Sequence, residues 1–169
     1  MLLPPSAGLL LQSCDASELL EPPLESNLFA QCAAAKLILL PVVNSSIVEQ
    51  ASRRSATGSH WSLLACWPAQ SRAIHYDSMP GSGNFRYASA LATKLGALLD
   101  KPLDSVKSGK SPTQLNVYDC GPCMLSCASA LLHDKDPGNS EVETPQAIRA
   151  KLLRIAQDLS EQEKKAVLR

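Results

Sequence analysis

The sequence has no excess of charge of either sign, with 16 Lys and Arg against 16 Asp and Glu in 169 residues. Proteins that bind nucleic acids usually carry a basic excess, so we expect no nucleic-acid partner. No apolar run approaches the roughly 18 residues that a membrane-spanning helix needs. The segment from Met1 to Pro5 lacks the positive charge that precedes the apolar core of a secretory signal. These absences argue against secretion, membrane insertion and nucleic-acid binding.

Hydrophobic residues make up 45% of the chain and charged residues 19%, which is typical of a globular protein. The length is that of one domain, and neither an internal repeat nor a low-complexity linker divides it. We therefore predict a single domain over residues 1–169. The six cysteines do not require a disulfide framework in a chain with this many core residues. They indicate reduced thiols and a location in the cytoplasm or nucleus.

Three short apolar runs predict strands, at residues 36–43, 62–67 and 73–77, and the last two form a plausible hairpin. Between residues 84 and 99 the apolar positions recur in steps of three and four, which predicts a helix with one buried face. The segment 105–113 is polar and is predicted to be a loop. Strands in the middle with helices on both sides predict a compact α+β domain.

Two further helices are predicted after this loop. One begins near Cys120, with Pro122 in its first turn, and the other begins at Thr144-Pro145, a cap residue followed by proline. The first is expected to bury Met124, Cys127, Ala128, Leu131 and Leu132. The second is expected to turn Ile148, Leu152, Ile155 and Leu159 inward.

Four dispersed residues form a candidate catalytic set. Cys120 stands at a predicted helix start, where the peptide dipoles and free N–H groups stabilise a thiolate. His60 begins one strand of the predicted hairpin and Asp77 ends the other, so the two are expected to be neighbours, with the carboxylate orienting the imidazole. Gln114 could offer its side-chain amide to an oxyanion. Taken singly, each of these residues is more often structural than catalytic.

The motifs Gly-Ser-His-Trp-Ser-Leu-Leu, His-Tyr-Asp-Ser and Gln-Leu-Asn-Val-Tyr-Asp-Cys-Gly, in this order and spacing, resemble the sentrin/SUMO-specific cysteine peptidases. Within these ubiquitin-like-protein proteases, the sequence is most similar to the NEDD8-specific members, the deneddylases. The resemblance covers nearly the whole chain. It implies a papain-like α+β fold of the adenain type and cleavage after the Gly-Gly terminus of NEDD8, or alternatively of SUMO. It implies no metal or organic cofactor, and we expect a monomer.

The resemblance also implies a role for each matching residue. His60 would take the proton of Cys120, and Asp77 would hold His60. Gln114 and the backbone N–H of Cys120 would form the oxyanion hole. Trp61 would cover the narrow channel that only a glycine pair can enter. The family's N-terminal helical segment, which bears a Trp-Leu-Asn-Asp-like motif, has no counterpart here, so we expect the chain to start after it.

Two other functions stay open. Cys120-Gly121-Pro122-Cys123 spells the thioredoxin motif, so a thiol-disulfide oxidoreductase is an alternative, and Cys123 is a possible redox partner of Cys120 in a reversible disulfide that silences the peptidase. A domain without the N-terminal segment could also bind a ubiquitin-like protein without cutting it. A zinc site formed by Cys120, Cys123, Cys127 and His133 is disfavoured, because the three cysteines fall on consecutive turns of one helix.

Overall fold

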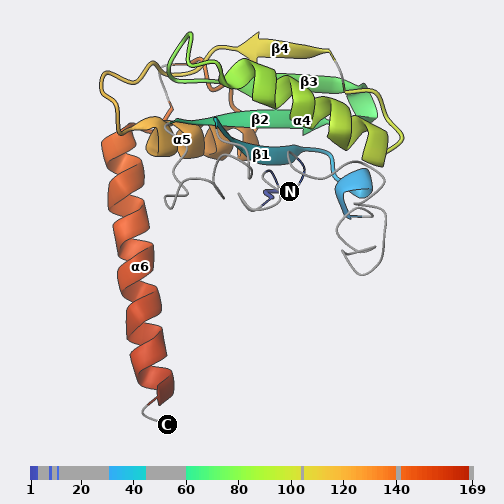
Figure 1. Ribbon diagram of the computed structural model, residues 1–169. Helices are drawn as coiled ribbons and strands as arrows, with labels where there is room; N and C mark the ends of the chain where they lie inside the picture. Colours follow the sequence, from blue (N-terminus) through green and yellow to red (C-terminus); the bar gives the residue numbers. More distant parts are fainter. Residues whose placement is uncertain are drawn as a thin grey trace, which may run out of the picture.

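The computed structural model describes residues 1–3, 8, 11, 31–44, 60–103, 105–139 and 142–167, with side chains as far as residue 162. Its centre is a four-stranded sheet in the order β1 (Ile38–Val43), β2 (Trp61–Trp67), β3 (Arg72–Tyr76) and β4 (Val106–Gly109). The first three strands are antiparallel neighbours, whereas β4 runs parallel to β3. Figure 1 shows this mixed sheet with helices around it, which confirms the predicted α+β class.

The hairpin that the sequence predicts is present. A single 3-10 turn, η2 (Pro68–Gln70), joins β2 to β3, and Ser71 closes it in the left-handed region at φ 47°. The register pairs Leu63 with Tyr76, so the residues just before β2 and just after β3 face each other. The hairpin therefore brings His60 and Asp77 to one end of the sheet.

The prediction of a loop over 105–113 is wrong in part, because β4 lies within it. This strand is short and mostly exposed, so its Val-Lys-Ser-Gly sequence shows no apolar alternation. Its order comes from backbone pairing with β3 at the sheet edge. A strand held in this way leaves little trace in the sequence pattern.

Strands β1 and β2 are buried on both faces of the sheet, and successive residues of each strand point to opposite faces. Leu40 and Leu64 belong to the core beneath α4 (Asn84–Leu98). Leu39 and Leu63 belong to the core beneath α5 (Cys120–Leu132). Because every strand position is needed by one helix or the other, β1 and β2 read as continuous apolar runs.

Two predicted helical faces are only partly buried. Leu132 is the last residue of α5 before the cap at His133, and its side chain is 55% exposed. On α6 (Pro145–Val167), Ile148 is buried, but Leu152, Ile155 and Leu159 are about half exposed, contrary to the prediction. Figure 1 shows the reason: α6 projects away from the rest of the described chain. None of the described helices has the length and apolar character required to cross a membrane.

This difference along α6 predicts two unequal substitutions. Ile148→Ala is expected to lower the free energy of unfolding by about 2–4 kcal/mol, because it opens a cavity where α6 meets α5. Ile155→Ala, two turns further on, is expected to change it by less than about 0.5 kcal/mol, because its side chain is already hydrated. Chemical denaturation of the two variants measures both values. Equal losses would mean that α6 packs along its whole length.

Candidate functional site

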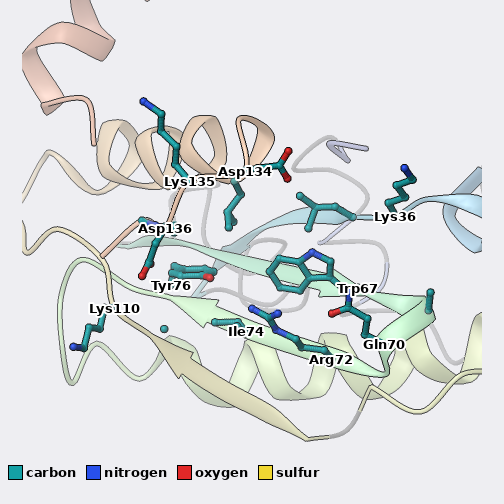
Figure 2. A pocket seen from close by; sticks show the side chains of 15 residues that line it. Lys36, Trp67, Gln70, Arg72, Ile74, Tyr76, Lys110, Asp134, Lys135 and Asp136 are labelled. Carbon is teal, nitrogen blue, oxygen red and sulfur yellow. The ribbon is translucent and has the colours of Figure 1, made fainter. Parts of the chain in front are cut away.

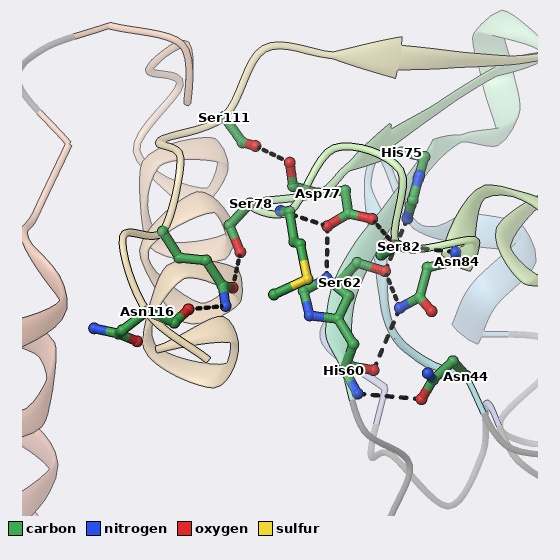
Figure 3. A network of polar contacts seen from close by, with 12 residues as sticks. Asn44, His60, Ser62, His75, Asp77, Ser78, Ser82, Asn84, Ser111 and Asn116 are labelled. Carbon is green, nitrogen blue, oxygen red and sulfur yellow. Dashed lines mark hydrogen bonds and ion pairs between the residues drawn. The ribbon is translucent and has the colours of Figure 1, made fainter. Parts of the chain in front are cut away.

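His60 and Asp77 meet at the end of the β2–β3 hairpin, as the sequence predicts. Nε2 of His60 lies 2.6 Å from Oδ1 of Asp77, and the imidazole is almost completely buried (Figure 3). Facing a carboxylate, Nε2 carries the proton and donates it, which leaves Nδ1 as the basic nitrogen. Among the described residues, Nδ1 of His60 has no hydrogen-bond partner. The site therefore holds an oriented imidazole with one nitrogen available as a proton acceptor.

The turn after β3 fixes the carboxylate of Asp77 (Figure 3). Its Oδ1 accepts a hydrogen bond from the backbone N–H of Met79 at 2.9 Å, and its Oδ2 accepts one from the hydroxyl of Ser82 at 2.5 Å. The hydroxyl of Ser111 donates to the backbone carbonyl of Asp77 at 2.7 Å. The sequence shows only a turn here, and sequence reasoning missed these supports. The Asp-Ser-Met order, an aspartate two residues before its N–H donor, is the signal that could have revealed the first.

A second polar group lies behind the imidazole and was also missed. The side-chain amide of Asn84, fully buried at the start of α4, donates to the hydroxyl of Ser62 at 2.9 Å and to the backbone carbonyl of His60 at 3.3 Å (Figure 3). Nε2 of His75 lies 2.8 Å from the same hydroxyl, and burial lowers the pKa of this histidine. Asn44 accepts the backbone N–H of His60. These contacts hold His60 from behind.

Cys120 occupies the first position of α5 and is nearly buried. Ser78, the residue after Asp77, ties this helix start to the hairpin. The Ser78 carbonyl accepts the backbone N–H of Gln114 at 2.9 Å, and its hydroxyl donates to Oε1 of Gln114 at 2.7 Å. The thiol of Cys123, one turn into α5, also lies close to the Ser78 side chain. The structure thus brings the first turn of α5, Gln114 and the His60–Asp77 pair to the same end of the sheet.

The amide of Gln114 has a fixed orientation. Its Oε1 accepts from Ser78, and its Nε2 donates to the backbone carbonyl of Asn116 at 2.6 Å. One N–H of the amide is used in this way, and the second remains as a donor. The sequence predicts a role for Gln114 but not the two hydrogen bonds that fix its amide.

Exposed apolar side chains stand on the loop that leads to Cys120. Leu115 is 97% exposed, and Val117 and Tyr118 are also largely exposed, all on the loop between Gln114 and Cys120. Trp61 begins β2 directly after His60 and is partly buried. Apolar groups gathered on an exposed loop are typical of a surface that meets another protein.

Cys123 is a free, fully buried thiol beside Ser78. Burial raises its pKa, which keeps it protonated at neutral pH. Its predicted redox partnership with Cys120 therefore requires prior oxidation of Cys120. Peroxide would convert the Cys120 thiolate to a sulfenic acid, and the Cys123 sulfur would displace water from it to form the disulfide. A dithiol would then restore both thiols.

This partnership gives a test by recovery. After brief peroxide treatment, activity of the wild type is expected to return on mild reduction, whereas Cys123→Ala is expected to stay largely inactive because its sulfenic acid oxidises further. The control is Cys127→Ala, which removes a buried thiol one turn deeper in the same helix. Peroxide inactivation of the wild type that no mild reductant reverses would contradict the pairing.

A further cavity lies away from this site. It has a volume of about 730 Å³ and opens over the sheet face beside the end of α5 (Figure 2). Trp67 and Arg72, whose guanidinium stacks on the indole at 4.3 Å, form one wall, and Tyr76 and Lys110 stand toward the other end. None of the four candidate catalytic residues lines it. The cavity is thus separate from the His60–Asp77 site.

Comparison with known proteins places these features in a family. Residues 30–166 match the Ulp1 protease family, C-terminal catalytic domain. The chain is 38% identical over 82 residues to sentrin-specific protease 8 of Homo sapiens, covering 47% of this chain and 38% of that protein. It is 29% identical over 131 residues to NEDD8-specific protease 1 of Arabidopsis thaliana, covering 77% and 54%.

The fold agrees with this match. The catalytic domain of the Ulp1-like SUMO protease of Chaetomium thermophilum superposes with a TM-score of 0.52 at 26% identity, over 75% of this chain and 46% of that one. The chain spans about two fifths to one half of the length of these curated relatives. The matched region contains His60, Asp77, Gln114 and Cys120. The chain belongs to the Ulp1 protease family.

Proposed function

We propose that this chain is a cysteine peptidase and isopeptidase that cuts after the C-terminal Gly-Gly of a ubiquitin-like modifier, NEDD8 in preference to SUMO. One observation carries the proposal. Nε2 of His60 is hydrogen-bonded to Asp77, its buried Nδ1 has no partner among the described residues, and a cysteine begins the helix at the same end of the sheet. A positioned base beside a thiol at a helix N-terminus is the arrangement that thiol peptidases use.

The geometry supports the following reaction. Nδ1 of His60 takes the proton of Cys120, and the thiolate is stabilised by the N-terminus of α5. The thiolate attacks the carbonyl carbon of the last glycine, and the oxyanion accepts hydrogen bonds from Gln114 and from the Cys120 backbone N–H. His60 returns the proton to the leaving amine, and water then hydrolyses the thioester. Asp77 stabilises the imidazolium throughout.

The partner is inferred from the relatives and from the surface. Relatives named for NEDD8 and for sentrin support a ubiquitin-like protein as substrate, and two of them are named NEDD8-specific. The exposed side chains of Leu115, Val117 and Tyr118 supply an apolar surface, on the loop that leads to Cys120, on which a modifier could lie. Trp61, next to His60, is the side chain we assign to the cover of the glycine channel. The monomeric state and the cytoplasmic or nuclear location stay predictions.

The alternatives are weaker. Family and fold favour a peptidase over a thiol-disulfide oxidoreductase, despite the Cys120-Gly-Pro-Cys123 motif. A domain that binds a modifier without cutting it would keep the exposed loop but would not need the Nδ1 of His60 unpaired.

A processing assay tests the proposal. NEDD8 and SUMO precursors with C-terminal extensions are incubated with the reduced protein, and the products are identified by mass. We expect cleavage directly after Gly-Gly, faster for NEDD8, and no cleavage by Cys120→Ala. Binding of NEDD8 without cleavage by a folded wild type would favour the non-catalytic alternative.

A further inference from the structure

The residue before the nucleophile has an unusual environment. Asp119 stands at the position that caps α5, yet its side chain makes no cap hydrogen bond. Its buried carboxylate instead receives two hydrogen bonds from Arg149 at Oδ1, from Nε at 3.1 Å and from Nη2 at 2.7 Å. Its Oδ2 receives one from the side-chain amide of Asn116 at 2.7 Å. Arg149 lies in the first turns of α6, a helix that otherwise projects from the body (Figure 1).

These bonds extend to the oxyanion side of the site. Arg149 also donates from Nη2 to the backbone carbonyl of Tyr118 at 2.9 Å. Oδ1 of Asn116 accepts the backbone N–H groups of Tyr118 and Asp119, and its carbonyl accepts from Nε2 of Gln114. A continuous series of hydrogen bonds therefore runs from α6 through the loop to Gln114. The loop carries both groups that must face the scissile carbonyl.

The lack of a side-chain cap at the N-terminus of α5 has a chemical consequence. A capping carboxylate would occupy N–H groups in the first turn of α5. Pro122 has no N–H to offer, and the Asp119 side chain is turned toward Asn116 and Arg149. The first N–H groups of the helix, including that of Cys120, have no partner within the helix and are left for a thiolate or an oxyanion.

The same contacts determine the ionisation of Asp119, the residue before Cys120. Hydrogen bonds from Asn116 and Arg149 hold the pKa of Asp119 below its usual range, so its carboxylate is ionised at neutral pH. An anion next to Cys120 disfavours the thiolate. The positive charge of the Arg149 guanidinium offsets the negative charge of Asp119, which would otherwise disfavour the thiolate that the reaction needs.

We propose that Arg149 is a positioning residue for this peptidase: it holds the loop between Gln114 and Cys120 in its reactive geometry through Asp119 and neutralises that carboxylate. The inference rests on the proposed function for its kinetic consequence. Arg149 lies outside the candidate catalytic set and acts through Asp119 and the loop, so its loss is expected to lower kcat and the reactivity of Cys120 more than it changes KM. Misplacement of a reacting group by about 1 Å can cost about 100-fold in rate.

The experiment compares Arg149→Met, which keeps the length of the side chain and removes the charge, with Arg149→Lys. The matched control is Arg154→Met, an exposed arginine further along α6 that makes none of these contacts. For each protein we would measure the melting temperature, the alkylation rate of Cys120 by iodoacetamide, and kcat and KM on a NEDD8 precursor.

Arg149→Met is expected to lower kcat by about 10- to 100-fold and the alkylation rate several-fold, with KM within about twofold of the wild type. Arg149→Lys is expected to recover part of the loss, because it restores the charge without the two-point contact. Adding Asp119→Asn to Arg149→Met is expected to cost much less than the sum of the two single effects, because both act through one contact.

Wild-type kinetics for Arg149→Met, a loss equal to that of Arg154→Met, or additive effects with Asp119→Asn would overturn the proposal. A loss explained wholly by an unfolded fraction in the melting curve would also overturn it. The alkylation rate keeps the two inferences separate. If the wild type cuts no modifier, the proposed function fails, yet slower alkylation of Cys120 in Arg149→Met would still support the positioning role.

Discussion

Asp77→Asn is expected to lower kcat on a NEDD8 precursor by about 10³- to 10⁴-fold while the protein stays folded. The asparagine loses the charge that stabilises the imidazolium. If its NH₂ turns toward Nε2 of His60, the amide loses the hydrogen bond that Oδ1 accepts from the backbone N–H of Met79, and the imidazole proton moves to Nδ1, the nitrogen that must take the proton of Cys120. If its NH₂ turns toward Ser82 instead, whose hydroxyl can accept, the tautomer is kept and only the charge is lost. Both orientations impair the base.

Steady-state kinetics with the purified variants measure this loss. The control is Asp158→Asn, the same change at an exposed position of α6, which is expected to keep wild-type kinetics. Ser82→Ala removes one support of the carboxylate and is expected to give an intermediate loss. If folded Asp77→Asn keeps kcat within about tenfold of the wild type, the carboxylate does not orient the base, and the assignment of Asp77 is wrong.

Asn84→Ala is expected to lower the free energy of unfolding by about 2–4 kcal/mol. Its buried amide supplies the hydrogens for the Ser62 hydroxyl and the His60 carbonyl, so its removal leaves two buried acceptors short of a donor and opens a cavity. Chemical denaturation measures the change. Thr93→Ala, at an exposed position of the same helix, should stay within about 0.5 kcal/mol of the wild type.

The Asn84 substitution also reports on the site. Because Asn84 bonds the backbone at His60, its loss should lower kcat in the fraction that remains folded, whereas Thr93→Ala should not. A loss of less than about 1 kcal/mol would mean that water replaces the amide without cost. The hydrogen bonds behind the imidazole would then not be what holds it.

The sequence predicts one contact of the site in full, that between His60 and Asp77. Both residues flank strands with strong apolar runs, and the alternation of a hairpin fixes which ends meet. Gln114 and Cys120 are recognised by their motif, but nothing in their spacing predicts the hydrogen bonds of Gln114 to Ser78 and Asn116. Hydrogen bonds between irregular segments have no period, so sequence reasoning has no pattern to read.

The errors have a similar origin. Helical periodicity shows that α6 has an apolar face, but not whether another element covers it, and the described chain covers only its start at Ile148. Strand β4 is ordered by backbone hydrogen bonds to β3 and not by apolar side chains. Its polar sequence therefore predicts a loop. Arg149 reads as one more cation on an amphipathic helix. Its role depends on where α6 begins relative to Asp119, and the tertiary structure determines this position.

The most direct test of the proposed activity is covalent capture by NEDD8 and SUMO probes that carry a thiol-reactive group in place of the C-terminal carboxylate. We expect a one-to-one adduct on Cys120 of the reduced wild type, formed faster with NEDD8, much slower in His60→Ala and absent in Cys120→Ala. A folded, reduced wild type that forms no adduct, or an adduct that persists in Cys120→Ala, would contradict it.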